Sequence, residues 1–169
     1  MTHPHQNQIL DQQQIRQKIT RMAYEMYEHN FEEKELVLAG IHENGYILAQ
    51  MLTQELQKIS GLSVTLLEVT IDKSAPVESQ VTLLPDTIDL AGKVVIVVDD
   101  VLNTGRILAY TLATFLKHAP RKVEIATLVD RRHKLFPVSA SYTGYSLATT
   151  LHEHVRVVLQ ESEVAAYLI

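Results

Sequence analysis

Two neighbouring carboxylates, Asp99 and Asp100, directly follow an aliphatic run at residues 94–98, and a polar Asn-Thr-Gly turn at residues 103–105 comes soon after. The backbone amides of such a turn, together with the N-terminus of a following helix, suit a phosphate group. Paired carboxylates suit the hydroxyls of a sugar or a hydrated Mg²⁺ ion. These residue types at this spacing predict a site for a phosphorylated sugar.

The segments on either side must hold these groups in place. Residues 94–98 read Val-Val-Ile-Val-Val, which is typical of a strand buried on both faces of a parallel sheet. Residues 106–118 have the pattern of a helix. Because ligands in open α/β sheets bind beyond the carboxyl ends of the strands, we expect the acidic pair to stand where this strand ends.

Two other interpretations of the acidic pair are open. A receiver-type pocket also places carboxylates at the end of a strand. Receivers carry their first acidic pair near the N-terminus, however, and this pair lies past the middle of the chain. In the second interpretation the residues form only a buried strand followed by a solvated acidic turn.

The composition limits the class of protein. The 169 residues include 15 basic and 20 acidic side chains, and the net charge of −5 disfavours a surface coated in positive charge for nucleic acid. Disulfides, thiolate zinc sites and cysteine nucleophiles are excluded because the chain has no cysteine. We expect one domain over residues 1–169, with residues 1–8 as a flexible tail. No membrane span or signal peptide is evident, so a cytoplasmic protein is expected.

The rest of the chain alternates helix and strand patterns. Asp11 and Gln14 have the spacing of a capping box, and apolar residues recur at helical spacing from there to about His29. This alternation predicts an α/β fold with a mostly parallel sheet covered by helices on both faces. The other predicted segments are a helix at 46–58, strands at 36–41, 64–71, 81–84, 122–129, 141–143, 155–160 and 164–168, a turn at 42–45 and a mobile loop at 72–80.

The aliphatic strand, the acidic pair and the Thr-Gly step resemble the phosphoribosyl pyrophosphate (PRPP) signature of type I phosphoribosyltransferases. The similarity covers residues 9–169 and points to one branch, the uracil phosphoribosyltransferases that regulate pyrimidine operons and also bind messenger RNA. The resemblance implies the type I phosphoribosyltransferase fold, a mostly parallel sheet flanked by helices with a small hood and a flexible loop. It also implies a transferase of pyrimidine salvage that releases pyrophosphate.

The resemblance implies a role for each part of the site. Asp99 and Asp100 hold the ribose hydroxyls and stabilise the positive charge on the ring, and Mg²⁺ is bound through PRPP, with the same pair as its candidate protein ligands. Arg131 and His133 face the nucleobase, with uracil as the expected base. The residues expected to hold the 5-phosphate are Val101, Leu102, Asn103, Thr104, Gly105 and Arg106. The expected pyrophosphate loop consists of His42, Glu43, Asn44 and Gly45.

The chain departs from the family pattern in two loops of the site. Asn44 stands where the family has an arginine, and Glu43 adds a negative charge beside the expected pyrophosphate. Lys73 is the only basic residue between Lys58 and Lys93, so the flexible loop lacks the basic run of the family. These departures support an alternative function, a regulatory protein that senses nucleotides with little or no catalysis.

The expected RNA face is altered as well. Thr20, Arg21 and Lys134 match the family, whereas Tyr24 replaces a histidine. Ser139 and Tyr145 replace residues that are usually basic. Because RNA affinity depends largely on the neutralisation of phosphates, these losses argue against RNA binding, which the resemblance otherwise implies. The resemblance also implies a homodimer or a larger homo-oligomer.

Overall fold

The computed structural model describes residues 7–77 and 80–169. Within these residues the helices are α1 (Gln12–His29), α2 (Asn44–Ile59) and α3 (Arg106–Leu116). The strands are β1 (Asn7–Leu10), β2 (Glu35–Ile41), β3 (Ser63–Thr70), β4 (Thr82–Leu84), β5 (Val94–Leu102), β6 (Lys122–Asp130), β7 (Tyr142–Ser146), β8 (Val155–Gln160) and β9 (Glu163–Leu168). The capping box is confirmed, since the Gln14 amide donates to Asp11 Oδ1 at 2.8 Å and the Asp11 amide donates to Gln14 Oε1 at 2.9 Å.

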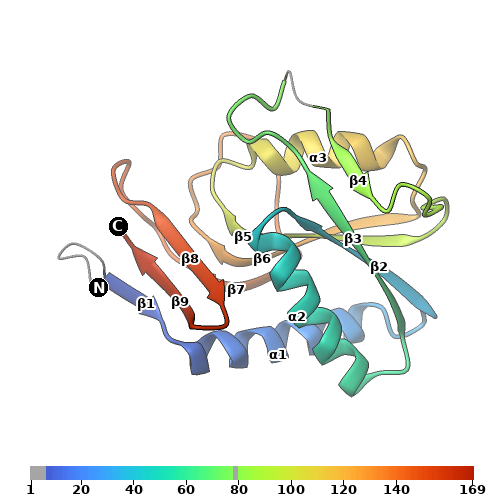
Figure 1. Cartoon of the computed structure of the whole chain (residues 1–169), viewed down its shortest axis with the longest axis horizontal. Coiled ribbons are helices and arrows are strands. Elements are labelled where there is room, and N and C mark those ends of the chain that lie inside the picture. Colours follow the sequence, from blue (N-terminus) through green and yellow to red (C-terminus); the bar gives the residue numbers. More distant parts are fainter. Residues whose placement is uncertain (1–6, 78–79) are drawn as a thin grey trace.

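The strands form two sheets (Figure 1). The main sheet has the order β4-β3-β2-β5-β6-β7, in which β3, β2, β5, β6 and β7 run parallel and β4 is antiparallel to β3. The small antiparallel sheet has the order β1-β9-β8 and is called the hood below. The predicted mostly parallel sheet and the small hood are confirmed.

Helices cover both faces of the main sheet, with α1 and α2 on one side and α3 on the other (Figure 1). In β2, Leu36 and Leu38 pack in the core under α1 and α2, while Val37 and Ala39 pack in the core under α3. Successive side chains of a strand point to opposite faces, so a strand between two helical layers must be apolar at every position. This explains the unbroken aliphatic runs in β2 and β5.

Several predicted boundaries were wrong. The strand expected to end at residue 98 continues to Leu102, because β6 pairs with it as far as Leu102 and Asp130. The acidic pair therefore lies within β5 rather than after it. Asn7 and Gln8, expected in a flexible tail, pair with β9 as part of β1, and residues 1–6 lie outside the described residues.

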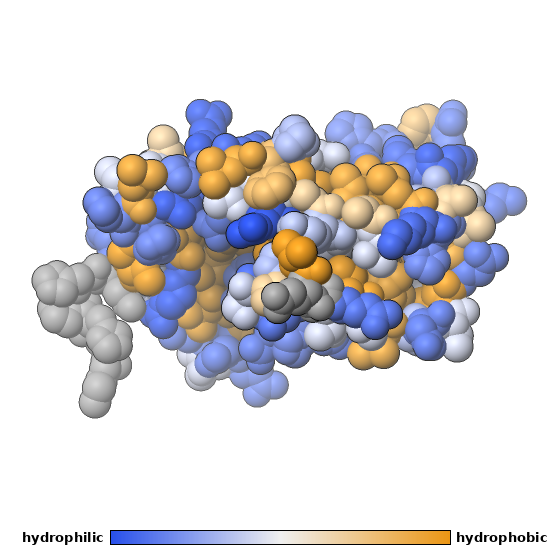
Figure 2. Space-filling view, turned by 90° about the horizontal axis from the view of Figure 1, so that it is seen from above, coloured by the Kyte–Doolittle hydropathy of each residue, from blue (hydrophilic) through white to orange (hydrophobic). Residues whose placement is uncertain are grey.

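The outer surface keeps some apolar side chains exposed. Figure 2 shows hydrophobic residues gathered in places on the face seen from above. Val77, Leu84 and Leu116 are 70%, 50% and 61% exposed, respectively. Of the residues of α3, only Arg106 carries a charge. The structure therefore leaves a considerable apolar area outside its two cores.

Two glycines bring the N-terminus of α2 against the main sheet. A Cβ atom on Gly40 would lie 2.4 Å from Tyr46 Cα and 2.7 Å from the carbonyl oxygen of Gly45. A Cβ atom on Gly45 would lie 2.6 Å from the carbonyl oxygen of Val98. Only glycine permits such close backbone contact, and the contact places the turn at 42–45 beside the acidic pair of β5.

We expect Gly40→Ala to lower the free energy of unfolding by about 1–3 kcal/mol, because the added methyl group collides with fixed backbone atoms. Gly61→Ala is the matched control, since nothing lies within 4 Å of a Cβ atom at that position. The control should stay within about 0.5 kcal/mol of the wild type. Urea unfolding measures both, and equal effects of the two substitutions would contradict the close contact at Gly40.

Candidate active site

The acidic pair lies near the carboxyl end of β5, the central strand between β2 and β6. Asp99 is buried, with 4% of its surface exposed, and Asp100 is half-buried. The Asp100 amide donates to Asp99 Oδ1 at 2.9 Å, and the Val101 amide donates to Asp100 Oδ1 at 2.9 Å. Both carboxylates are thus fixed by backbone N–H groups of their own strand.

Burial raises the pKa of Asp99 well above its usual range, and the charge of Asp100 raises this pKa further. The ammonium of Lys73 opposes this shift from 3.8 Å. A buried carboxyl group beside a second carboxylate is unfavourable in the ionised state unless a cation or hydrogen-bond donors approach it. The site therefore favours a ligand that brings hydroxyl donors or a cation to Asp99.

The turn at residues 103–105, predicted to bind phosphate and called the phosphate turn below, lies directly beyond the acidic pair. Gly105 precedes α3 with a φ of 84°, a left-handed conformation that favours glycine. The first hydrogen bond of α3 runs from the Ala109 amide to the Gly105 carbonyl at 2.9 Å, so the helix begins here and its N-terminus faces the turn. The positive end of the helix dipole suits an anion at this point.

A cavity of about 100 Å³ joins the acidic pair to the phosphate turn. Lys73 supplies a cation on one side of this cavity. The remaining lining comes from Asp99, Asp100, Val101, Leu102, Asn103, Thr104, Gly105, Arg106, Ile107 and Leu108. The structure thus brings together the acidic pair and all six residues predicted to bind the phosphate.

The loop after β6 braces the phosphate turn from the other side. The amides of Leu135 and Phe136 donate to the Thr104 carbonyl at 2.9 and 3.1 Å, and the Arg131 amide donates to the Leu102 carbonyl at 3.1 Å. These backbone contacts fix the turn without using its side chains. A rigid turn of this kind needs little reorganisation when an anion binds.

Two side chains of the predicted pyrophosphate loop, His42 and Asn44, already have partners within the protein. His42 Nδ1 lies 2.6 Å from Glu68 Oε1, and Glu43 is exposed. Asn44 Nδ2 donates to Asp100 Oδ2 at 3.0 Å and to the Val157 carbonyl at 2.9 Å. The loop therefore lies beside the acidic pair, and its His42 and Asn44 side chains are engaged with neighbouring groups of the protein.

The predicted base-binding residues lie in different surroundings. Arg131 is 5% exposed, and its guanidinium donates to Thr149 Oγ1 at 2.6 Å and to the Thr150 carbonyl at 3.0 Å. His133 is half-buried. The Arg131 contacts join the end of β6 to the segment that leads into the hood strand β8.

Some residues of the site were not predicted from sequence patterns. Lys73 carried one signal, its isolation as a cation in a long loop, but nothing in the sequence placed it next to Asp99. Glu68 and Thr149 carried no signal, because their partners are distant in the chain and only the folded sheet brings them together.

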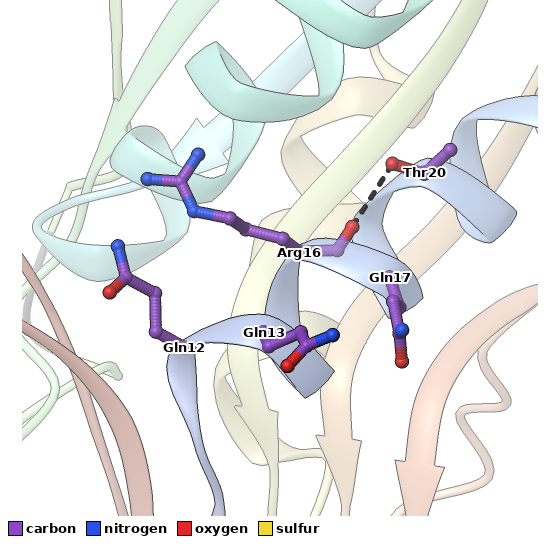
Figure 3. Close-up of a pocket in the computed structure, with 5 residues that line it drawn as sticks. All are labelled: Gln12, Gln13, Arg16, Gln17 and Thr20. Carbon is purple, nitrogen blue, oxygen red and sulfur yellow. Dashed lines mark hydrogen bonds between the residues drawn. The ribbon is translucent and has the colours of Figure 1, made fainter.

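A larger hollow of about 530 Å³ lies over α1, away from the acidic pair. Figure 3 shows its lining side chains, with Gln12 and Arg16 extending to one side and Gln17 pointing away from them. The Thr20 hydroxyl donates to the Arg16 carbonyl at 3.0 Å. Because this hollow has no carboxylate in its lining, we place the chemistry in the smaller cavity.

The basic residues of the predicted RNA face are engaged within the protein. Arg21 donates to the carbonyls of Thr143 and Gly144 at 2.9 and 2.8 Å, and Lys134 lies 3.5 Å from Asp130. Such contacts compete with phosphate binding. The uncharged positions of this face are Thr20, Tyr24, Ser139 and Tyr145.

The phosphoribosyl transferase domain family is matched over residues 5–162, and the chain belongs to this family. It is 36% identical over 159 residues to the bifunctional protein PyrR of Macrococcus caseolyticus, with 90% of this chain and 91% of that protein covered. It is 35% identical over 161 residues to the pyrimidine operon regulatory protein of Lactococcus lactis subsp. lactis, with 92% and 91% covered. The family resemblance expected from the sequence is confirmed.

A solved structure supports the fold. The crystal structure of a hypoxanthine-guanine phosphoribosyltransferase from Bacillus anthracis matches with a TM-score of 0.76 at 21% identity, covering 96% of this chain and 98% of that one. The type I phosphoribosyltransferase fold is thus confirmed. Among residues 7–77 and 80–169, no helix is long and apolar enough to cross a membrane, and no group of three or more His, Cys, Asp or Glu side chains is arranged to hold a metal.

We expect Asp99→Asn to stabilise the protein at high pH. The folded-state pKa of Asp99 is raised, so ionisation of Asp99 lowers the free energy of unfolding. This loss of stability is absent below the unfolded-state pKa of about 3.9 and is complete above the folded-state pKa. Thermal unfolding at pH 8 should give a midpoint about 2–4 °C higher than that of the wild type, which corresponds to ~1 kcal/mol at this size. A gain of the same size at pH 3.5 would contradict the assigned cause.

Proposed function

We propose that this protein is a phosphoribosyltransferase that moves ribose 5-phosphate from PRPP to a nucleobase, with uracil as the base and pyrophosphate as the second product. The observation that carries the proposal is the single cavity in which Asp99 and Asp100 adjoin the phosphate turn and Lys73. The family membership and the relatives named PyrR support the same reaction.

The phosphate turn and α3 bind the 5-phosphate in this proposal. The amides at the start of α3 donate to its oxygens, the helix dipole adds a favourable potential, and Arg106 lies at the same end of the cavity. Asp99 and Asp100 accept hydrogen bonds from the ribose hydroxyls. In this proposal the C1 atom of the sugar faces both the 42–45 loop, on the side of the leaving pyrophosphate, and Arg131 and His133, on the side of the base.

The acidic pair also acts on the reaction. The bond from C1 to pyrophosphate lengthens before the base attacks, so positive charge develops on the ribose ring. Carboxylates fixed by backbone amides stabilise that charge with little reorganisation, in surroundings drier than water. Holding the base and the sugar in line lowers the activation barrier further, by the order of 7–11 kcal/mol in well-oriented systems.

Mg²⁺ fits this site as a partner of PRPP. Its preferred ligands are oxygens, and it often binds through one or two carboxylates together with substrate phosphates. Asp99 and Asp100 are the carboxylates that would hold it here, and a bound cation would offset the burial and the neighbouring charge of Asp100 that raise the pKa of Asp99. When bound, Mg²⁺ supplies screening of the negative charge on the leaving pyrophosphate.

Arg131 and His133 remain the proposed contacts of the base. The guanidinium of Arg131 is held by Thr149 and Thr150, in the segment that leads into the hood strand β8. Fixed donors suit the carbonyl oxygens of uracil. A homodimer or larger homo-oligomer and a cytoplasmic location are part of the proposal, and the exposed apolar side chains of the surface are consistent with self-association.

A second function is favoured by the 42–45 loop. Asn44 donates both of its amide hydrogens to protein acceptors, and Glu43 brings a negative charge to the side where pyrophosphate leaves. Pyrophosphate therefore finds few donors in this loop. A regulator that binds nucleotides and turns over PRPP poorly fits this observation, as does the name of the Lactococcus lactis relative.

The enzyme is tested by incubating the protein with PRPP, Mg²⁺ and each free base in turn while pyrophosphate release is followed. We expect release with uracil and little with the purines. Binding of a uridine nucleotide without release from any base would instead favour the regulator.

The site assignment is tested by replacing both acids, Asp99→Asn with Asp100→Asn. We expect PRPP affinity, measured by calorimetry, to fall at least about 100-fold, since two charge-assisted hydrogen-bond acceptors are lost. Circular dichroism should show the double variant folded. An unchanged affinity would remove the acidic pair from the site.

Filter binding tests the RNA role. We expect no saturable binding of a pyrimidine-operon leader RNA even at low salt, because Arg21 and Lys134 are engaged within the protein and Ser139 and Tyr145 carry no charge. Saturable binding that weakens linearly with the logarithm of salt concentration would show that phosphate contacts form despite these losses.

A further inference from the structure

Asn44 joins the acidic pair to the hood. It is the first residue of α2, and its side chain lies between the end of β5 and the edge strand β8 of the hood. The amide nitrogen Nδ2 donates to Asp100 Oδ2 at 3.0 Å and to the Val157 carbonyl at 2.9 Å. One small side chain therefore bonds both to the sugar-facing carboxylate and to the hood.

The chemistry of the partners fixes the orientation of this amide. A carboxylate and a backbone carbonyl are acceptors only, so both must face the NH₂ group rather than the oxygen of Asn44. The two N–H bonds are thereby both engaged with the protein. Nothing but the acceptor Oδ1 is left for a ligand, which makes residue 44 a poor partner for a phosphate.

A second side chain, that of Arg131, bonds to the segment before the hood strand β8 but does not reach the acidic pair. Arg131 donates to Thr149 and Thr150, in the segment before β8, from the end of β6. The hydrogen bonds of Asn44 connect an acidic-pair carboxylate directly with a hood strand. A change at Asp100 can therefore reach β8 through the Asn44 side chain.

We propose that Asn44 is a positioning residue that couples the hood to the acidic pair, so that a sugar bound at Asp100 loosens β8. The proposal rests on the proposed function only in taking the acidic pair as the ribose site. Ribose hydroxyls donate to the same carboxylate that holds Asn44, and they compete with its amide for Oδ2. When that bond is lost, the Asn44 side chain is held at one end only, so its bond to the Val157 carbonyl weakens and the hood moves more freely.

The coupling follows from differential binding. A ligand shifts a conformational equilibrium only by the difference in its affinity for the two states. Here the state with the Asn44–Asp100 bond leaves fewer acceptor positions for ribose than the state without it. The expected size is that of one charge-assisted hydrogen bond, roughly a ten-fold change in the opening equilibrium of the hood.

Ribose 5-phosphate with Mg²⁺ is the probe that tests this coupling. It has no base, so it fills the phosphate turn and the acidic pair without touching the hood, and calorimetry first establishes that it binds. Hydrogen exchange is then followed in peptides covering β8, residues 155–160. We expect exchange in β8 to become about ten-fold faster when the sugar phosphate is bound.

Three variants locate the coupling at Asn44. In Asn44→Ala, β8 should exchange fast without ligand, and ribose 5-phosphate should add no further change. Asn44→Asp is nearly isosteric and loses both donors, so it should give the same result if the alanine variant folds poorly. Thr149→Val is the matched control, because it removes a bond of Arg131 but leaves Asn44 intact. It should keep the ligand-dependent change.

The outcomes separate the two proposals. Binding of ribose 5-phosphate with unchanged or slower exchange in β8 overturns the coupling and leaves the proposed function standing. A ligand-dependent change that persists in both Asn44 variants also overturns it. Failure of ribose 5-phosphate to bind the wild type overturns the assigned sugar site and, with it, this inference.

Discussion

The burial of Asp99 is the constraint on which the rest of the site depends. Asp99 lies in the central strand of the sheet and is buried under the N-terminus of α2. The helix approaches the sheet this closely because residues 40 and 45 are glycines. Burial and the neighbouring Asp100 make its charge unfavourable, as the raised pKa indicates. The ionised carboxylate costs stability unless a hydrogen-bond donor or a cation such as Lys73 lies close to it. Functional sites often keep such unfavourable groups at the expense of stability.

The two ends of the cavity are built differently. At the end predicted to hold phosphate, the amides at the start of α3 adjoin a turn that the Leu135 and Phe136 amides brace. At the opposite end, His42 and Asn44 are engaged with Glu68 and Asp100. The end predicted to bind the 5-phosphate thus leaves its backbone donors available, whereas the side chains of His42 and Asn44 at the end predicted to bind pyrophosphate already have partners in the protein.

Residues that the family resemblance assigns to ligands also hold the protein together here. Arg131 joins the main sheet to the segment before β8, and Asn44 joins α2 to the hood. Arg21, expected to face RNA, donates instead to the carbonyls of β7. A ligand at any of these residues would therefore have to compete with hydrogen bonds that already form within the protein.

The sequence by itself determined the fold class, the capping box of α1 and the adjacency of the acidic pair to residues 101–106, because these depend on local patterns: aliphatic runs, short polar turns and helical spacing. It did not determine the true end of β5, the pairing of Asn7 and Gln8 with β9, or the approach of Lys73 to Asp99. Only the tertiary structure decided these features. Each depends on a partner distant in the chain, and residue type alone does not reveal which distant groups the packed sheet will bring within bonding distance.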